Sequence, residues 1–361
     1  MKNKKILELC LAHGLGGLEI FVAHCYDDFS KKTRCKVVVA PGTKLDNYLG
    51  DIDKFCIKRD KFFPFIPAYQ LAKYIDKHDI DIIHFHWTKD SITAVLAKLL
   101  SKKRPKLVQS RHMRMTRFKD DFYHRWLYKN IDMIHAVTEG VAQELKKFIP
   151  AAIRPKIEMI YLGVKEAVVD EKKVALLQER YQLGKSFVIG IIGRIEEEKG
   201  QYKVIESLAK LQEFDMKLLI VGSAMQESYI EVLQKKAEDL GVANRVIFTG
   251  FTQDVNEHIA LCDTLVLATE NETFGFVVIE AMVANKAVIA TAKGGPLEII
   301  DDGKNGLLFD GTAGDLAEKI LFLYKNPERK EELASHAKKR VKEKFEREKQ
   351  LGKLFDVLTK V

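Results

Sequence analysis

The sequence predicts an α/β protein made of two doubly wound domains, each built on a parallel sheet covered by helices on both faces. Short runs rich in Val, Ile and Leu alternate with helix-like segments along the whole chain, as they do in buried parallel sheets. The alternation occurs twice, and 361 residues are too many for one hydrophobic core. The seam lies near residues 161–166. We therefore expect domains at residues 1–164 and 165–361, with the last helix crossing back to the first domain.

The elements of each domain follow from local composition and periodicity. Continuous β-branched runs favour strands, and apolar residues repeating every three or four positions favour helices. In the first domain we expect strands at residues 4–12, 36–40, 82–86, 106–110, 133–138 and 157–161, and helices at 18–29, 67–78, 91–100 and 141–149. In the second we expect strands at residues 186–193, 217–222, 245–250, 264–268, 287–291 and 306–309, with helices between them. Ligands of such sheets bind at the carboxyl ends of strands, so two facing domains would bind a ligand across a cleft.

Composition narrows the class of protein. The apolar share of 47% is that of an ordinary globular protein, and no window approaches 18 uninterrupted apolar residues. The first ten residues, MKNKKILELC, are basic but lack the apolar core and cleavage site of a signal peptide. The five cysteines are scattered, with no CxxC pair, which argues against a zinc or disulfide scaffold. We expect a cytoplasmic protein.

Charge is divided unevenly along the chain. Of the 59 Lys and Arg and 51 Asp and Glu, residues 1–164 hold 30 and 18, a net of +12, which leaves −4 for residues 165–361. A basic first half suggests an anionic partner. The candidates are an anionic membrane leaflet, which would place the protein on the cytoplasmic face of the inner membrane, or a phosphorylated acceptor. The alternative is a set of ordinary solvated lysines.

A glycine-rich turn follows the first strand. HGLGGLE, residues 13–19, contains Gly16 and Gly17, but Glu19 occupies the third position of the dinucleotide fingerprint GxGxxG. Glycines at the start of a helix expose amide N–H groups, which suit a phosphate. A tight strand-to-helix turn without a ligand explains the same residues.

Similar turns end successive strands of the second domain. GRIEEEKG, residues 193–200, begins with Gly193 and brackets an acidic turn with Arg194 and Lys199. These two cations either clamp a diphosphate or pair with the glutamates between them. Gly222 ends the next strand, and Phe251 follows the one after, where it could face a flat base.

Two glutamates flank an apolar stretch in ENETFGFVVIEAM, residues 270–282. We expect a buried helix from about Phe274, so a carboxylate within it needs a partner, and the hydroxyls of a ligand could serve. Glu280 lies about 2.2 helical turns beyond Glu272, so one carboxylate could bind a ribose and the other a hexose. The amides of Phe274, Gly275 and Phe276 would form an anion site between them. This arrangement fits a nucleotide sugar.

These residues resemble a known family. Glu272-x7-Glu280, followed by AMVANKAVIAT, GGPLEII and DGKNGLLF, resembles the C-terminal half of the family-4 retaining glycosyltransferases, which have the GT-B fold of two Rossmann-like domains facing across a cleft. GRIEEEKG and GLGGLE match two further turns of the family, and the resemblance covers nearly the whole chain. The chain departs from the pattern at Leu162, where the family usually has Asn.

The resemblance implies a role for each matched residue. Glu280 would bind the ribose and Glu272 the transferred sugar, while Arg194 and Lys199 would hold the diphosphate. The glycine loop would approach the phosphates from the first domain. His112 matches a histidine beside the donor sugar, and His86 would face the acceptor.

The implied reaction moves a hexose, with retention, from a nucleotide diphosphate sugar to a hydroxyl of a glycolipid or polysaccharide precursor, such as lipopolysaccharide core, O-antigen or capsule. The donor is expected to be UDP-linked and to be a substrate, so no cofactor is expected. The diphosphate itself would help to take the proton, and the protein would stabilise the developing charge. Neither Asp51-Ile52-Asp53 nor Asp79-Ile80-Asp81 lies at a suitable strand end, so no metal is expected.

Two other classes of protein would each explain part of the sequence. A nicotinamide-dependent oxidoreductase needs the third glycine that Glu19 replaces and an acidic residue after the second strand, where PGTK stands. A nucleic-acid binder would explain the basic and aromatic residues of 111–129 but leaves the paired glutamates unexplained. A nucleotide-sugar epimerase of the same fold is the alternative within the fold.

Overall fold

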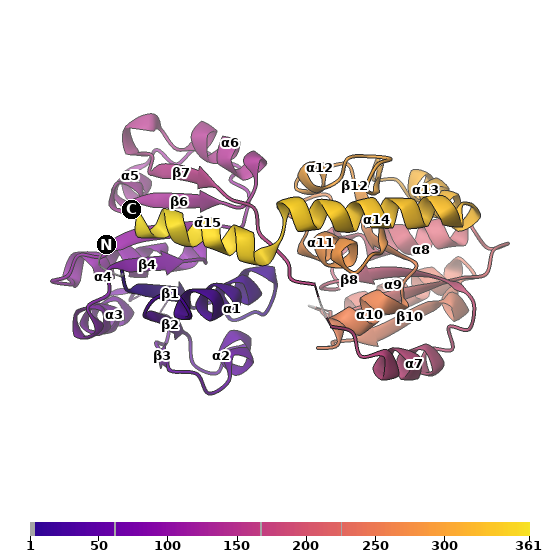
Figure 1. The fold of residues 1–361 in the computed structure, drawn as a ribbon, viewed down its shortest axis with the longest axis horizontal. Helices are drawn as coiled ribbons and strands as arrows, with labels where there is room; N and C mark the ends of the chain where they lie inside the picture. The colour runs from indigo at the N-terminus through magenta and orange to yellow at the C-terminus, as the bar shows by residue number, and fades with distance from the viewer. Residues whose placement is uncertain (1–3, 61–62, 167, 225) are drawn as a thin grey trace. The chain divides into compact units, whose positions relative to one another are not determined.

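A computed structural model describes residues 4–60, 63–166, 168–224 and 226–361. The chain forms two compact units: Met1–Leu162 together with Glu348–Val361, and Gly163–Arg347. The N-terminal segment of the first unit thus ends within the predicted seam, two residues before the predicted boundary at residue 164, and the unit also includes the C-terminal segment. Figure 1 colours both units along the chain, and we describe each unit separately.

The first unit contains a seven-stranded parallel sheet in the order β3-β2-β1-β4-β5-β6-β7. Its strands are β1 (Ile6–Cys10), β2 (Cys35–Val39), β3 (Lys54–Cys56), β4 (Ile82–Phe85), β5 (Lys106–Arg111), β6 (Met133–Ala136) and β7 (Lys156–Met159). Its α-helices are α1 (Gly17–Ser30), α2 (Lys44–Leu49), α3 (Phe65–His78), α4 (Ser91–Leu100), α5 (Phe122–Asn130), α6 (Glu139–Phe148) and α15 (Arg347–Thr359).

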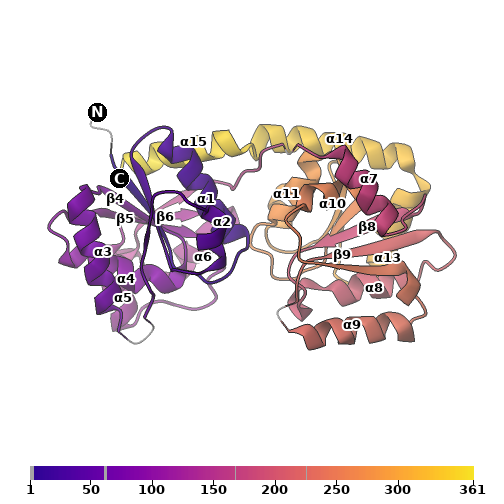
Figure 2. The ribbon, with the colours of Figure 1, turned by 90° about the horizontal axis from the view of Figure 1, so that it is seen from below.

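The last helix belongs to this first unit. The rings of Phe355 on α15 and Phe29 on α1 lie 5.5 Å apart, and Lys4 Nζ donates to the carbonyl oxygen of Val361 at 2.9 Å. Figures 1 and 2 both show α15 in yellow, running over the first unit. This unit is therefore assembled from two segments that are far apart in the sequence.

The second unit contains a six-stranded parallel sheet in the order β10-β9-β8-β11-β12-β13. Its strands are β8 (Phe187–Ile192), β9 (Met216–Val221), β10 (Val246–Gly250), β11 (Thr264–Leu267), β12 (Ala287–Thr291) and β13 (Leu307–Phe309). Its α-helices are α7 (Glu171–Arg180), α8 (Gln201–Ala209), α9 (Glu227–Asp239), α10 (Val255–Leu261), α11 (Phe276–Val283), α12 (Pro296–Ile299), α13 (Ala313–Lys325) and α14 (Pro327–Lys344). Figure 2 shows α8, α9 and α13 on one side of this sheet and α10, α11 and α14 on the other.

The two parallel sheets confirm the predicted fold class, and three local differences have physical causes. The strand β3 was not predicted because it has only three residues, at the edge of the sheet. The helix α5 was not predicted because its apolar residues are aromatic and interleaved with cations. The helix α11 begins at Phe276 rather than Phe274, because Gly275 at its N-cap has φ 106°, a conformation that favours glycine.

No helix among the described residues is both long enough and apolar enough to cross a membrane. The apolar side chains instead form the cores of the two units. In the second unit, Ile189, Leu218 and Ile289 from the strands β8, β9 and β12 are fully buried in one cluster. This burial fixes the strand ends where the predicted site residues lie.

Candidate active site

Two glycine turns meet at the carboxyl ends of β8 and β9. Gly193 has φ 148° and Gly222 has φ 143°, and a Cβ atom at Gly222 would clash with the carbonyl oxygen of Gly193. Both positions therefore depend on glycine, the second because the two backbones touch. This close approach leaves the strand ends without side chains, as a site that admits a phosphate requires.

The two predicted cations have different partners. Arg194 extends from β8 and pairs with Glu196 at 3.0 Å, and its side chain is more than half exposed. Lys199 does not pair with the acidic turn, because its Nζ atom lies 3.1 Å from Oε2 of Glu272. Gly200, with φ 72°, packs against the backbone of Ala268 at the end of β11, which brings the turn that carries Lys199 up to the Glu272 segment. The structure thus brings Lys199 and Glu272 into direct contact.

The turn that carries Glu272 rests on a second pair of glycines. The amide of Gly295 donates to the carbonyl oxygen of Glu272 at 3.0 Å. A Cβ atom at Gly294 would strike that same carbonyl, and one at Gly295 would strike the backbone of Phe274. The GGPLEII motif therefore has a structural task, which is to hold the Glu272 turn against the end of β12.

Glu280 lies in the second half of α11 and is half-buried. Burial raises the pKa of its carboxyl to about 7. Among the described residues no side chain forms a hydrogen bond or ion pair with this carboxylate. Because residues 272–275 are not helical, the predicted spacing of 2.2 helical turns between the two glutamates was wrong. Glu280 is nevertheless a half-buried carboxylate that no described side chain pairs with, and such a group calls for a ligand.

The aromatic residues near these glutamates divide by exposure. The side chain of Phe274 is buried and packs edge-on against Phe276 and Phe345, so only its amide could meet a ligand. Phe276 is half-buried beside it. Phe251 is 59% exposed after β10, where its ring is free to stack on a base.

A neighbouring charged cluster was not predicted. Lys203 on α8 lies 2.6 Å from Glu270, and Lys293 lies 3.2 Å from the same carboxyl group. Hydrogen bonds from Lys203 and then Lys293 lower the pKa of Glu270. Lys203 is almost completely buried. The signal for this cluster was a lysine on the apolar side of a predicted helix, which requires a nearby counter-charge.

In the first unit, the predicted phosphate loop is closed by a side chain. Glu19 caps the start of α1, because its Oε2 atom accepts a hydrogen bond from the amide of Gly16 at 2.8 Å. The amide of Gly16 is therefore engaged, contrary to the prediction of free N–H groups. A phosphate here would have to displace the Glu19 carboxylate, while Gly17 stays exposed beside it.

His112 and His86 lie next to each other at the ends of β5 and β4. Nδ1 of His86 is 3.4 Å from Nε2 of His112, and Nε2 of His86 is 2.7 Å from Oε2 of Glu8. His86 is buried, so the prediction that it faces an acceptor was wrong. His112 is half-buried, and its ring packs edge-on against Phe21. Only His112 of the pair could contact a ligand directly.

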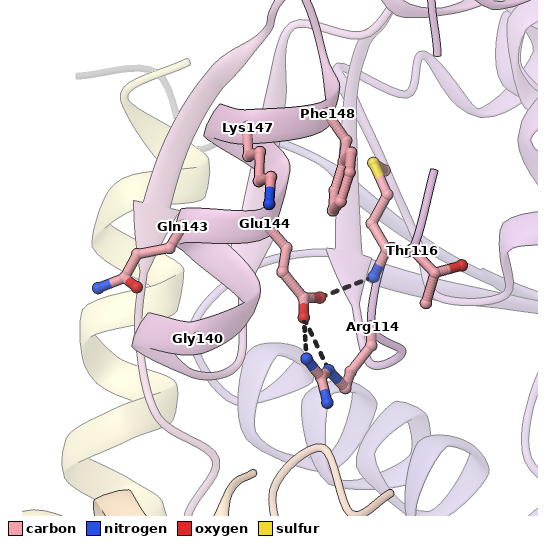
Figure 3. A pocket seen from close by; sticks show the side chains of 8 residues that line it. Arg114, Thr116, Gly140, Gln143, Glu144, Lys147 and Phe148 are labelled. Carbon is pink, nitrogen blue, oxygen red and sulfur yellow. Dashed lines mark hydrogen bonds and ion pairs between the residues drawn. The ribbon is translucent and has the colours of Figure 1, made fainter. Parts of the chain in front are cut away.

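The segment after His112 is tied to α6. Glu144 on α6 accepts hydrogen bonds from Arg114 Nε at 2.7 Å and from the amide of Met115 at 2.8 Å. Figure 3 shows this interaction within a pocket of about 500 Å³ whose labelled lining also includes Lys147 and Phe148. The pair fixes the path of the chain as it leaves β5.

Comparison with known proteins identifies relatives for both units. The family model described as glycosyltransferase family 4 matches residues 15–168, and the one described as glycosyl transferases group 1 matches residues 176–340. The chain is 28% identical to N-acetyl-alpha-D-glucosaminyl L-malate synthase of Bacillus anthracis over 78% of this chain and 75% of that protein. It is 29% identical to the putative glycosyltransferase EpsD of Bacillus subtilis over 84% and 83%. The solved structure of HepE from Anabaena with UDP and glucose has a TM-score of 0.87, with 22% identity over 99% of this chain and 100% of that one.

Proposed function

The chain belongs to the family-4, group 1 glycosyltransferases and has the GT-B fold, and from this premise we propose that it transfers a hexose, with retention, from a UDP-sugar to a hydroxyl group. The acceptor we propose is a glycolipid or polysaccharide precursor of the cell envelope. The observation that carries the proposal is Glu280, the enclosed carboxylate without a side-chain partner among the described residues. Ribose hydroxyls would supply the missing hydrogen bonds.

The charges of the second unit support a diphosphate leaving group. Lys199 contacts Glu272, and Arg194 is mostly exposed and paired only with Glu196. Surface ion pairs of this kind are weak, so a diphosphate can take over both cations. Displacement of Lys199 from Glu272 would free the Glu272 carboxylate for the hydroxyls of the transferred sugar. The solved HepE structure that contains UDP and glucose supports the choice of nucleotide.

The experiment that tests this proposal is a thermal-shift screen of nucleotide sugars, followed by transfer assays. A true donor at 100 times its Kd should add about 2.7 kcal/mol of stability. Glu280→Gln should weaken binding of the nucleoside diphosphate about 10- to 100-fold, because a charged hydrogen bond contributes roughly 1.5–3 kcal/mol. Glu272→Ala should lower turnover more than nucleotide affinity. Equal binding of UDP to the wild type and to Glu280→Gln would disprove the ribose role.

We also propose that transfer needs no metal ion. The leaving-group charge would be met by Arg194 and Lys199, which act as fixed cations near the diphosphate. Activity should therefore survive EDTA. Loss of activity in EDTA with recovery in Mg²⁺ would contradict this assignment of the two cations.

The acceptor side is proposed to meet an anionic membrane surface. Phe63, Phe65 and Ile66 are exposed at the start of α3, after the basic residues Lys58 and Arg59. The patch that we predict from the sequence also includes the exposed members of residues 111–129, together with Lys61 and Phe62, which lie outside the described residues. A basic residue near an anionic leaflet contributes about 1 kcal/mol. Vesicles with anionic lipid should bind the protein at low salt and release it at high salt, whereas neutral vesicles should not bind it. Failure to bind either would leave the basic charge with the role of steering a soluble anionic acceptor such as malate.

A further inference from the structure

A continuous chain of hydrogen bonds crosses the buried interior of the first unit and ends at His112. Its inner end is the carbonyl oxygen of Ile160, which is 2.7 Å from Nε2 of His135. Nδ1 of His135 lies 2.6 Å from the hydroxyl of Ser110, which lies 2.7 Å from Nε2 of His84. The chain then reaches Glu8, through Nδ1 of His84 at 3.0 Å from Oε1. It leaves through His86 toward His112, by the contacts described above.

The sheet register assembles this chain. The strands β1, β4, β5 and β6 are neighbours, Glu8 is paired with His84, and Ser110 is paired with His135. All of these side chains are buried. A buried polar group must be satisfied within the protein, so each ring nitrogen in the chain has to be matched as donor or acceptor with its neighbour.

The carbonyl oxygen of Ile160 determines where the protons lie in the part of the hydrogen-bond chain between Ile160 and Glu8. A carbonyl oxygen only accepts, so Nε2 of His135 carries a proton and donates it to Ile160. Burial lowers the pKa of His135 to about 3, so its ring is neutral and Nδ1 is an acceptor. The hydroxyl of Ser110 must then donate to His135 and accept from Nε2–H of His84. With Glu8 as the acceptor on its other side, His84 donates from both ring nitrogens.

The proton positions between Glu8 and His112 follow from the same reasoning. Hydrogen bonds and charge from His84, together with a hydrogen bond from His86, outweigh burial and lower the pKa of Glu8, so the carboxylate accepts from Nε2–H of His86. Burial lowers the pKa of His86 to about 4, which leaves Nδ1 of its neutral ring as an acceptor. His112 must therefore donate from Nε2. Burial also lowers the pKa of His112, and among the described residues nothing forms a hydrogen bond with its Nδ1.

We propose that Glu8 is a positioning residue that acts through His86 to hold His112 in a single tautomer, with Nε2–H directed into the protein and the lone pair of Nδ1 presented to a substrate hydroxyl. This proposal rests on the proposed function. It makes Nδ1 of His112 an acceptor-only group. A sugar hydroxyl can donate to such a group, whereas an imidazole free to exchange tautomers would present an N–H donor at Nδ1 for part of the time. His86, predicted as an acceptor contact, becomes the link between Glu8 and His112.

A metal ion is the competing explanation for part of this cluster. One ligand atom each from Glu8, Cys25 and His84 lies within 4.8 Å of the others. However, both oxygens of Glu8 and both nitrogens of His84 already form the hydrogen bonds of the chain. Burial also raises the pKa of Cys25 far above its usual value, which disfavours the thiolate that a metal requires. The chain of hydrogen bonds therefore explains why these polar residues lie together, without a metal ion.

The first measurement is the tautomer of each histidine in the wild-type protein, read from ¹⁵N chemical shifts of the ring nitrogens at pH 7. His112, His86 and His135 should each be neutral and protonated at Nε2, while His84 should be protonated at both nitrogens. Signals are assigned by loss in single His→Gln variants. A proton on Nδ1 of His112 would overturn the proposal, and this result needs no variant of Glu8 to fold.

The second measurement uses Glu8→Gln, which keeps the size of the side chain but places an N–H donor against His84 or His86. His112 should then lose its single tautomer, and kcat should fall about 10- to 100-fold, as when groups that orient a reacting side chain are removed. Gln109→Leu is the matched control: Gln109 is also buried on β5 but alternates to the other face from Ser110, so the tautomer of His112 and kcat should persist.

The outcomes separate the proposal from the proposed function. Retention of Nε2–H alone on His112 in Glu8→Gln, with kcat within twofold of the wild type, would overturn the proposal while glycosyl transfer stands. Absence of transfer from any nucleotide sugar would remove the proposed function, yet the tautomers could still be read by NMR. Thermal unfolding of both variants checks that a loss of activity does not arise from loss of the fold.

Discussion

The strand ends of the two units hold their polar groups in opposite ways. In the first unit, Glu8, Ser110 and four histidines are linked through hydrogen bonds, and of these side chains His112 alone is not fully buried. In the second, glycine backbones pack together, Arg194 forms an exposed ion pair and Lys199 forms a half-buried one, while Glu280 has no side-chain partner among the described residues. The first edge is preorganised by side chains. We expect the second to exchange its ion-pair partners when a ligand binds.

The largest expected effect is a loss of kcat when Lys199, a cation at the strand ends of the second unit, is removed. Lys199→Ala should lower kcat about 10²- to 10³-fold, because the leaving diphosphate loses a compensating cation. Lys236→Ala is a suitable control, since Lys236 also pairs with a glutamate, Glu206, but does so between α9 and α8. The test compares the steady-state transfer rates of the two variants with that of the wild type. Equal losses in both would show that a general charge effect, and not the strand-end cation, is responsible.

The next largest effect concerns the glycine backbones. Gly222→Ala should destabilise the second unit by about 3 kcal/mol or more, because its Cβ atom would overlap the backbone of Gly193. Gly241→Ala, with φ 71° but no atom near its Cβ position, should cost only about 1–2 kcal/mol for the left-handed conformation. Urea unfolding followed by circular dichroism measures both. Similar costs at the two positions would mean that conformation, not contact, requires the glycines.

The smallest expected effect is a pH-dependent difference in stability between the wild type and Glu280→Gln. Burial raises the pKa of Glu280 from 4.5 to about 7 in the folded state. Its contribution to stability is therefore complete below pH 4.5 and is lost as the pH rises through 7. Glu280→Gln avoids this loss, so it should be more stable than the wild type at pH 8 by about 1–3 kcal/mol and should differ little at pH 4.5. A pH-independent difference between the two proteins would contradict the burial of an unpaired carboxylate.

The amino-acid pattern predicted the sheets well because each buried strand is a continuous apolar run. It also singled out Glu272 and Glu280, since a carboxylate in apolar surroundings is conspicuous. The same signal was present in the first unit: Glu8 interrupts ILELC and His135 interrupts MIHA. The sequence does not predict a role for Glu8 or His135, because the partners of these residues depend on which strands are adjacent. The strand order and register are properties of the folded sheet.

The contacts of charged residues were harder to predict for a related reason. Lys199 was expected either to bind a diphosphate or to pair with the acidic turn beside it, and it contacts Glu272, 73 residues away. Glu19 was noted only as the residue that spoils a glycine fingerprint, and it caps α1. In both cases the sequence identified an unusual residue, and only the three-dimensional arrangement supplied its partner.

The return of α15 to the first unit has a consequence for biosynthesis. The ribosome makes residues 1–162 first, but residues 348–361, which complete that unit, emerge only after all of the second unit has been made. During this interval the side of α1 around Phe29, which α15 covers in the finished protein, is without its cover. The second unit, by contrast, is continuous in sequence and can fold as soon as it leaves the exit tunnel. The part of the molecule that is translated first is thus the last to be completed.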